Sequence, residues 1–315
     1  MLRMNSLKVS QTIPSGYTQA YPEILYNRPT FLSANNSLPQ LHFYLLDSSS
    51  KEVLGHIAFS REENEVLSPY RAPFGGFELA LDMENEFFLF FVAEVLRQLK
   101  ENHVRFVQLH LPPAAYLPAA PALVKDLQAL GFREKKKPAH HIIGITDESF
   151  EAKISTMERR KLRKAASLNC RFQIEKRHEY AAIYEFIRMH RSAKGHELSM
   201  SWEMLKEVIS GHKQHYVFCS VKLEDQLIAA AIMVRVSENV LYYYIPGHNA
   251  EFNSISPMVF LLNGLYDWSQ AQGVQSIDLG TSYWANQENK SLATFKKRIG
   301  GVPTTGSVLR KALSS

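Results

Sequence analysis

Residues 240–280, VLYYYIPGHNAEFNSISPMVFLLNGLYDWSQAQGVQSIDLG, decide the fold of this chain. The apolar and aromatic run VLYYYI that opens the segment predicts a strand. Residues 257–271 carry apolar side chains at helical spacing, and Ser256 and Pro257 are a favoured N-cap and first helical residue. The closing VQSIDLG predicts a second strand. Because strand, helix and strand in this order form a crossover between parallel strands, we expect a helix packed on a mixed sheet.

The segment before this crossover predicts a β-meander. HYVFCSV (215–221) and LIAAAIMVRV (227–236) are apolar runs with polar turns between them, so they precede the strand at 240–245 as two further strands. The first half of the chain repeats this order, with Ile57 in the place of Ile232. The sequence therefore predicts an α/β protein of two copies of one unit, each a β-meander followed by a β-α-β crossover. The matching elements of the first half are expected at 41–47, 53–60, 65–70, 85–100 (the helix) and 104–111.

A polar run marks the expected boundary between the two copies. GITDES at 144–149 breaks the apolar pattern. We therefore predict an N-terminal domain of residues 1–146 and a C-terminal domain of residues 147–315. The acidic start of the second domain is expected to open a basic helix. Two further helices are expected ahead of its meander, at 179–193 and, capped by Ser201, at 202–209.

Composition excludes several classes of protein. The 315 residues are 45% hydrophobic and 21% charged, which is not the composition of a disordered or collagen-like chain. No apolar run approaches the roughly 20 residues that span a bilayer, and MLRMNSLKVSQT at the start lacks the apolar centre of a signal peptide. Cys170 and Cys219 are too far apart for a CxxC motif and are expected to be free thiols in a reducing compartment. We expect a cytoplasmic protein without a transmembrane segment, for which peripheral membrane contact stays open.

Positive charge is concentrated in the second half of the chain. The net charge is +5 at pH 7, yet residues 151–177 alone carry nine Lys or Arg against three Glu. Residues 290–311 carry six more Lys or Arg and no acid. Two such runs favour an anionic ligand or partner, tRNA among them, whereas solvated helix faces are the alternative interpretation.

Four segments resemble one family. RRKLRKA (159–165) is similar to the basic helix that opens the second unit of the Fem-type aminoacyl and peptidyl transferases and their FemAB-like relatives. GLYDWSQAQGVQSIDLGTS (264–282) resembles the family's helix, Gly and strand ending in Asp-Leu-Gly. NKSLATFKKRIGG (289–301) resembles its Phe-Lys followed by a Gly pair, and SPYRAPFGGFE (68–78) a segment of its first unit. The resemblance implies two tandem GNAT-like units with mixed sheets, and an acyltransferase activity.

The resemblance also implies a catalytic lysine. The lysine of the Phe-Lys pair corresponds to Lys296, which would supply a positive charge where an oxyanion develops during acyl transfer. Asp278 and Tyr244 stand in the two strands that flank the crossover helix, where ligand crevices often form, and are further catalytic candidates. Because alternation puts Tyr242 and Tyr244 on one face, packing within the sheet is the competing interpretation for both.

The start of the crossover helix is the expected site for an anionic group of the donor, because unpaired N–H groups and the positive end of the helix dipole meet there. The loop lacks the Gly-rich pattern typical of acetyl-CoA-binding GNAT enzymes, and Glu251 would repel phosphate. A capped helix that binds nothing is therefore the alternative. The residues expected to bind donor or cofactor are Gly247, Asn253, Ser254 and Ser256. The residues expected to bind substrate are Arg159, Arg163, Tyr283, Asn289 and Arg298.

We therefore expect an enzyme that transfers an acyl or aminoacyl group to an amine or hydroxyl acceptor. The donor is expected to be acyl-CoA, another thioester or an aminoacyl-tRNA, and the acceptor a small molecule or a lipid-linked or cell-wall precursor. No residue stands in a nucleophile motif and no HExxH pattern accompanies His212 and His215, so no covalent intermediate, metal site or tightly bound cofactor is expected. The competing hypothesis is a non-catalytic GNAT-like scaffold for an anionic ligand.

Overall fold

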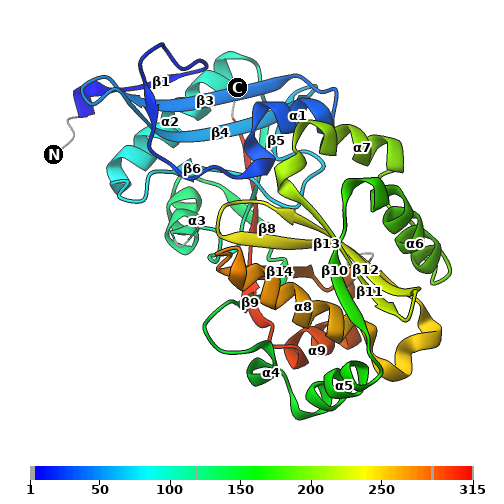
Figure 1. Cartoon of the computed structure of the whole chain (residues 1–315). Coiled ribbons are helices and arrows are strands. Elements are labelled where there is room, and N and C mark those ends of the chain that lie inside the picture. Colours follow the sequence, from blue (N-terminus) through cyan, green and yellow to red (C-terminus); the bar gives the residue numbers. More distant parts are fainter. Residues whose placement is uncertain (1–3, 118, 285–286, 314–315) are drawn as a thin grey trace. The chain divides into compact units, whose positions relative to one another are not determined.

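The structure is a computed structural model, which describes residues 4–117, 119–284 and 287–313 (Figure 1). The chain forms two compact units. One contains the residues up to Pro138 together with those from Thr305, and the other is Ala139–Thr304. The second unit is thus inserted between two segments of the first.

This division differs from the predicted boundary between residues 146 and 147. The strand β9 (Ala139–Gly144) pairs with a strand of the second unit, and the last strand, β18 (Ser307–Ala312), pairs with strands of the first. Sheet membership is decided by pairing between residues far apart in the chain. The polar run at 144–149 marks only the turn after β9.

A mixed sheet forms the first unit. Its elements are η1 (Met4–Ser6), β1 (Leu7–Ser10), β2 (Thr18–Gln19), η2 (Leu25–Asn27), α1 (Pro29–Asn35), β3 (Gln40–Asp47), β4 (Glu52–Glu62), β5 (Glu65–Ser68), β6 (Glu78–Leu79), α2 (Asn85–Glu101), β7 (Phe106–Leu111), α3 (Ala120–Ala129), β8 (Arg133–Lys136) and β18. The strand order is β1-β3-β4-β5-β7-β18-β8, with β2 and β6 paired to β4. The predicted meander is β3, β4 and β5, and α2 leads to β7, which runs parallel to β5. Phe88 and Phe91 of α2 share an apolar core with Phe43 and Ile57 of the meander.

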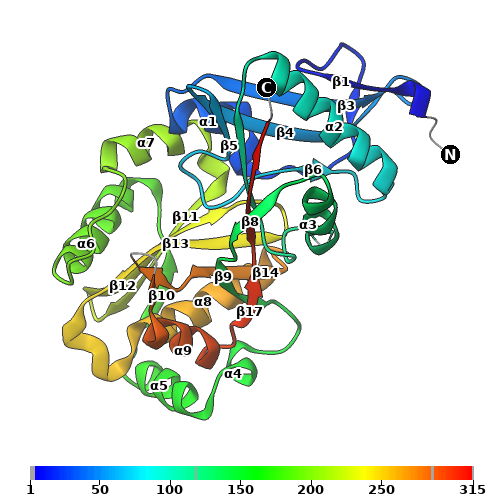
Figure 2. The ribbon, with the colours of Figure 1, turned by 180° about the vertical axis from the view of Figure 1, so that it is seen from behind.

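The second unit is a mixed sheet with more helices. Its elements are β9, α4 (Phe150–Lys153), α5 (Thr156–Ser167), β10 (Arg171–Ile174), η3 (Arg177–Glu179), α6 (Tyr180–Ser192), α7 (Trp202–Gly211), η4 (Lys213–His215), β11 (Tyr216–Leu223), β12 (Gln226–Arg235), β13 (Val240–His248), η5 (Ala250–Ile255), α8 (Pro257–Ala271), β14 (Ser276–Thr281), β15 (Tyr283–Trp284), β16 (Gln287–Glu288), α9 (Lys290–Arg298) and β17 (Val302–Thr305). The strand order is β10-β11-β12-β13-β14-β9-β17, and β15 and β16 form a separate hairpin. Figure 2 shows the end of this sheet where β14, β9 and β17 follow one another. The crossover β13-α8-β14 is the one that the sequence predicts.

Helices cover both faces of the second sheet. Ala229 and Ala231 of β12 belong to the apolar core that α8 shares. Ala230 points to the other face and pairs with Gly247 of β13. A Cβ at Gly247 would stand 3.0 Å from Ile187 Cα of α6, so α6 lies directly against that face. The first helix of the extra layer predicted ahead of the meander, α6, is therefore the cover of this second face.

The internal repeat that the sequence predicts is confirmed by strand register. Phe43 pairs with Ile57 in the first sheet, and Phe218 pairs with Ile232 in the second. The two sheets also share the end order of crossover strand, antiparallel strand and outer strand, β7-β18-β8 in one and β14-β9-β17 in the other. β9 follows β8, the outer strand of the first sheet, but pairs in the second sheet. β18 follows β17, the outer strand of the second sheet, but pairs in the first sheet. The two copies have therefore exchanged their last strands.

Pairing between the two crossover strands of the second unit is short. Residues 240–242 of β13 pair in parallel with residues 276–278 of β14. Past Tyr242, the described residues of β13 have no further partner in β14. Because both strands continue beyond this point, an opening is left between their ends, and the candidate site begins there.

The basic segment differs from its prediction. The polar residues after β9 lead into α4, which ends at Lys153 rather than continuing as one basic helix. Ile154 has extended backbone angles and is buried, so its side chain in the core turns the chain before α5 begins. None of the helices in the described ranges is long and apolar enough to cross a membrane.

Candidate active site

A cavity of about 650 Å³ lies in the second unit. Its walls come from the ends of β13 and β14, the start of α8, the helices α6 and α9, and one lysine of α5. The cavity therefore opens where the two crossover strands stop pairing. The predicted site residues that line it are Tyr244, Gly247, Asn253, Ser256, Tyr283, Asn289 and Lys296.

Lys296 is a buried cation in this wall. It lies in the last turn of α9, and Phe295 beside it also lines the cavity. The residue is 5% exposed, and Nζ donates to the carbonyl oxygens of Gly280 at 2.9 Å and Thr281 at 2.7 Å. Because an ammonium group has three N–H donors, this arrangement leaves one for a group in the cavity.

The surroundings of Lys296 set its charge. Burial lowers the pKa of Lys296 to about 8, and the negative charge of Asp278 acts in the opposite direction. The amine is therefore mostly charged at pH 7 and mostly neutral at pH 9. A charged group with this little solvent around it interacts more strongly with a nearby anion than a surface lysine does.

Gly280 shapes the end of β14 beside this lysine. Its φ of +70° is in the left-handed region, which disfavours side chains. A Cβ there would stand 3.2 Å from the hydroxyl oxygen of Tyr242. A glycine at this position therefore turns the strand so that two successive carbonyl oxygens bond to Lys296.

Asp278 holds the same end of β14 in place from outside the cavity lining. It is 0% exposed and does not line the cavity. Its Oδ1 accepts a hydrogen bond from Gly280 N at 2.7 Å, and its Oδ2 lies 3.0 Å from His140 Nδ1 of β9. The structure thus places this sequence-predicted catalytic residue where it positions Gly280, outside the lining of the cavity.

Tyr244 lines the cavity as a half-buried side chain. Its ring lies 6.3 Å from that of Tyr242, so the two share a face as the alternation predicts. Burial raises the pKa of Tyr244, which keeps the phenol protonated near neutral pH. The protonated side chain can donate or accept a hydrogen bond there.

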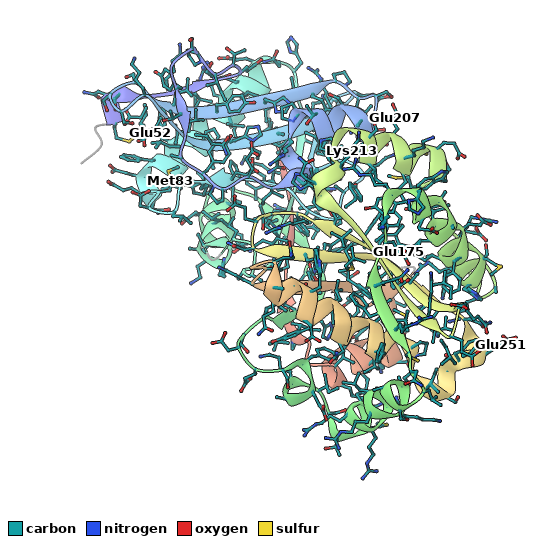
Figure 3. The ribbon with its side chains drawn as sticks, viewed as in Figure 1. Glu52, Met83, Glu175, Glu207, Lys213 and Glu251 are labelled. Carbon is teal, nitrogen blue, oxygen red and sulfur yellow. The ribbon has the colours of Figure 1, made fainter. Side chains whose placement is uncertain are left out.

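The start of α8 borders the cavity in a form that the sequence did not predict. Ser256 stands at the N-cap position and Pro257 at the first helical position, but the Ser256 side chain makes no cap hydrogen bond. Its φ of +51° directs the hydroxyl back to the carbonyl of Asn253, at 3.4 Å. Ser254 is exposed and lies outside the cavity lining, as does Glu251 of η5, which Figure 3 labels.

A group of basic side chains from α6 and β13 was missed by the sequence analysis. His190, Arg191 and Lys194 of α6 and of the turn after it line the cavity together with His248. The sequence signal for them is the lack of an acidic partner at helical spacing. Arg188 on the same helix has such a partner, because Glu185 three residues before it forms an ion pair with it. Within the described residues, neither Arg191 nor Lys194 forms an ion pair with a carboxylate.

The hydrogen-bond donors of these basic side chains are only partly satisfied. Arg191 Nη1 donates to the carbonyl of Pro246 at 3.4 Å, and its buried Nε has no hydrogen-bond partner among the described residues. His248 Nε2 lies 3.3 Å from Lys194 Nζ and 2.8 Å from Asn253 Oδ1. Burial lowers the pKa of Arg191, Lys194 and His248. An anion at this end of the cavity would offset that desolvation and give the guanidinium its missing acceptor.

The charge of the whole lining has one sign. Four Lys or Arg and three His are among the described lining residues, and none of these residues is Asp or Glu. The cavity is therefore suited to an anionic ligand. Lys296 bonds to Gly280, which lies against Tyr242 of β13. His190, Arg191 and Lys194, which we call the α6 cations, lie further along β13, where Arg191 contacts Pro246 and Lys194 contacts His248. Within the described part of the chain, no cluster of three or more His, Cys, Asp or Glu is placed to hold a metal ion.

The remaining predicted substrate-binding cations lie outside this cavity. Arg159 donates from Nε to the carbonyl of Ile154 at 3.1 Å, and Arg163 forms an ion pair with Glu151 at 2.5 Å. Arg298 is exposed. The lysine of α5 that does line the cavity is Lys161, whose Nζ lies 3.0 Å from Oε1 of the buried Glu158.

The fold and the cavity together define a class of protein. A meander followed by a parallel crossover, with an opening between the crossover strands, is the arrangement of GNAT acyltransferase domains. Residues 152–296, which lie within the second unit, match the family model described as the Acetyltransferase (GNAT) domain. The second unit therefore has a GNAT-like acyltransferase fold, and the same topology in the first unit makes the chain a tandem protein.

Solved structures show the same architecture over nearly the whole chain. FemX is similar with a TM-score of 0.73 at 12% identity, covering 93% of this chain and 94% of FemX. L-PGS from Bacillus licheniformis has a TM-score of 0.57 at 14% identity, with 93% and 94% covered. The C-terminal domain of a putative lysylphosphatidylglycerol synthetase from Agrobacterium fabrum has a TM-score of 0.57 at 11% identity, with 91% and 87% covered. Among curated proteins, none matches this chain significantly. The chain thus has the tandem GNAT-like fold that FemX shares, as its sequence resemblance to the FemAB-like proteins implies.

Proposed function

We propose that the second unit transfers an acyl or aminoacyl group from an activated donor to an amine or hydroxyl acceptor. The observation that carries this proposal is the buried ammonium of Lys296 at the end of β14, inside the cavity where β13 and β14 stop pairing. A charged group fixed in a cavity wall is already oriented before a reaction begins. It therefore stabilises charge that develops beside it without a further cost of reorganisation.

Lys296 would act on the carbonyl of the donor. When the acceptor attacks, the carbonyl oxygen becomes an oxyanion, and the N–H that Gly280 and Thr281 leave unused would bond to it. The two backbone carbonyls keep Nζ in place, and Asp278 keeps Gly280 in place through its bond to the backbone N–H. The oxyanion then collapses and breaks the bond to the thiolate sulfur or the ribose oxygen of the donor, and that atom takes up the proton that the acceptor amine or hydroxyl loses as its bond to the acyl carbon forms.

Transfer would be direct, without an acyl-enzyme. Neither cysteine lines the cavity, and burial raises the pKa of both thiols, which disfavours the nucleophilic thiolate. Ser256 is the serine among the described lining residues, and its hydroxyl donates to the Asn253 carbonyl rather than to a histidine or a carboxylate. Tyr244 would hold the acceptor by hydrogen bonding, with Tyr283 and Asn289 on the other side of the cavity.

The donor would carry a phosphate group. The α6 cations and the uncapped start of α8 lie at the end of the cavity away from Lys296 along β13, and no carboxylate is among the lining residues. Phosphate is shared by acyl-CoA and by aminoacyl-tRNA, so this cluster favours both over an uncharged ester. Gly247, Asn253 and Ser256 would contact the same end of the donor.

The acceptor would be an amine or hydroxyl of a lipid or cell-wall precursor. The lysylphosphatidylglycerol synthetase relatives are named for an aminoacylated lipid. Lipid acceptors of this kind agree with a cavity that has tyrosine and phenylalanine beside its cations. A cytoplasmic location would agree with either donor.

The donor can be identified by a binding screen followed by a turnover assay. Thermal shift with acyl-CoAs and with charged tRNA would reveal the donor, because a ligand at 100 times its Kd stabilises the fold by about 2.7 kcal/mol. Mass spectrometry of reactions with amine and lipid acceptors would then detect the acylated product, with Lys296→Ala as the control. Product formed by the parent and lost in the control supports the proposal. Binding of a phosphate-bearing ligand with no product from any acceptor would favour the non-catalytic scaffold instead.

A further inference from the structure

The helix α5 presents an exposed face that combines cations with apolar side chains. At 100° per residue, Met157, Arg160, Lys164 and Leu168 lie within about 80° of one another around the helix axis. Met157 is 45% exposed and Leu168, the C-cap residue, is 43% exposed. Along the helix axis, one apolar side chain therefore stands on either side of the two cations. We call this solvent-facing surface of four side chains the α5 face.

The opposite side of the helix accounts for its folding. Leu162 and Ala165 are buried in the core that α8 shares, so they hold the helix in place without help from the α5 face. Glu158 is also buried, and it pairs with Lys161. The negative charge of α5 thus points inward, and the face that meets solvent is positive.

The α5 face adjoins the cavity. Lys161, which follows Arg160 in the helix, lines the cavity itself. Lys164 Nζ donates to the carbonyl of Ser254 at 3.1 Å, which joins the helix to η5 just before α8 begins. A partner that covers the α5 face would therefore lie next to the cavity.

We propose that the α5 face docks on an anionic lipid bilayer. Cations next to a bilayer are attracted by its negative surface charge, and apolar side chains on the same face enter the boundary between headgroups and acyl chains. An RNA backbone would use Arg160 and Lys164 in a similar way, but it would gain nothing from Met157 and Leu168. The exposed apolar pair is the observation that favours the bilayer.

Docking in this way would bring lipid headgroups to the cavity. If the acyl acceptor is a lipid, as the proposed function has it, the α5 face would deliver that acceptor beside Lys161. The docking itself needs no catalysis, because none of its residues bonds to Lys296. The two proposals can therefore fail separately.

The test is sedimentation of the full-length protein with vesicles. Vesicles of phosphatidylglycerol and phosphatidylcholine should bind the protein, and vesicles of phosphatidylcholine alone should not. Each cation is worth roughly a factor of five in partitioning, so Arg160→Ser with Lys164→Ser should lower binding by about 25-fold. The matched control, Lys206→Ser with Lys213→Ser, removes two exposed cations from α7 and the turn after it, where Figure 3 labels Lys213. It should leave binding within about twofold, because α7 and α5 lie at opposite ends of the second unit (Figures 1 and 2).

An apolar pair of variants separates a bilayer from RNA. Met157→Ser with Leu168→Ser leaves the charge unchanged and should lower vesicle binding by about tenfold. Circular dichroism confirms that each variant is folded. Equal vesicle binding by the parent and by this apolar variant overturns the proposal, as does a parent that binds RNA but no anionic vesicle. Lys296→Ala should bind vesicles like the parent, so loss of turnover without loss of binding would not touch the docking.

Discussion

Lys296→Ala tests the central residue of the proposed reaction. The substitution removes the ammonium that donates to Gly280 and Thr281 and that faces the cavity. Removal of one group that stabilises an oxyanion lowers kcat by about 10²- to 10³-fold. Lys296→Arg keeps a charge but changes its shape and reach, so we expect only partial activity.

The pH dependence gives the same residue a second readout. Burial lowers the pKa of Lys296 to about 8, so its charge is lost as the pH rises through that value. If the charged form is the active one, kcat falls above pH 8 in the parent and falls only at higher pH in Lys296→Arg. A general base would give the opposite sign, with a rate that rises through pH 8.

The buried charge of Lys296 lowers the free energy of unfolding at neutral pH. The pKa falls from 10.5 to about 8 on folding, so between these values the unfolded chain binds more protons and stability rises with pH. This contribution is on the order of 1 kcal/mol between pH 7 and pH 9. The difference in the free energy of unfolding between the parent and Lys296→Met should change by that amount over this range, in urea denaturation.

The assay is turnover of the donor identified in the binding screen, measured by product formation at saturating donor from pH 6 to pH 10. The donor affinity is measured in parallel, because Lys296→Ala should change kcat far more than Kd. A kcat within about twofold of the parent, an energy difference of only about 0.4 kcal/mol, would refute the reasoning.

Three further substitutions test other parts of the account. Arg191→Ala should weaken the binding of a phosphate-bearing donor by about tenfold and make it less sensitive to salt, with kcat within twofold; isothermal calorimetry at two salt concentrations checks this. Asp278→Ala removes the bonds to Gly280 N and to His140, and should lower the free energy of unfolding by about 2–4 kcal/mol in urea. It should also move the alkaline fall in kcat to lower pH, because Asp278 raises the pKa of Lys296. Gly264→Ala would place Cβ 2.2 Å from Phe172 Cγ, so we expect a loss of about 1–3 kcal/mol by thermal unfolding without a change in donor Kd.

The repeated elements could be predicted from the sequence because their signals are local. The apolar spacing in α8 and the aromatic run of β13 decide helix and strand within a few residues, and the predicted helix 257–271 has the bounds of α8. Lys296 could be found because its Phe-Lys pair is a motif. Its burial agrees with an apolar neighbour on one side and an exposed Lys297 on the other.

The exchange of last strands could not be predicted. β9 and β18 are short runs whose sequences fit either sheet, and their partners lie more than 100 residues away in the chain. Asp278 illustrates the same limit, since its partner His140 belongs to the exchanged strand β9. The spacing of Arg191 and Lys194 indicates that they lack an acidic partner in their own helix, but it does not indicate whether such cations face solvent or a cavity.

A structure of the protein with a non-hydrolysable donor analogue tests the central claim most directly. The account predicts that the oxygen of the analogue's carbonyl mimic lies about 2.7–3.1 Å from Lys296 Nζ, with its phosphate on Arg191 and Lys194. An analogue bound with its reacting carbon outside the opening between β13 and β14, and with no oxygen in hydrogen-bond reach of Lys296, would contradict it.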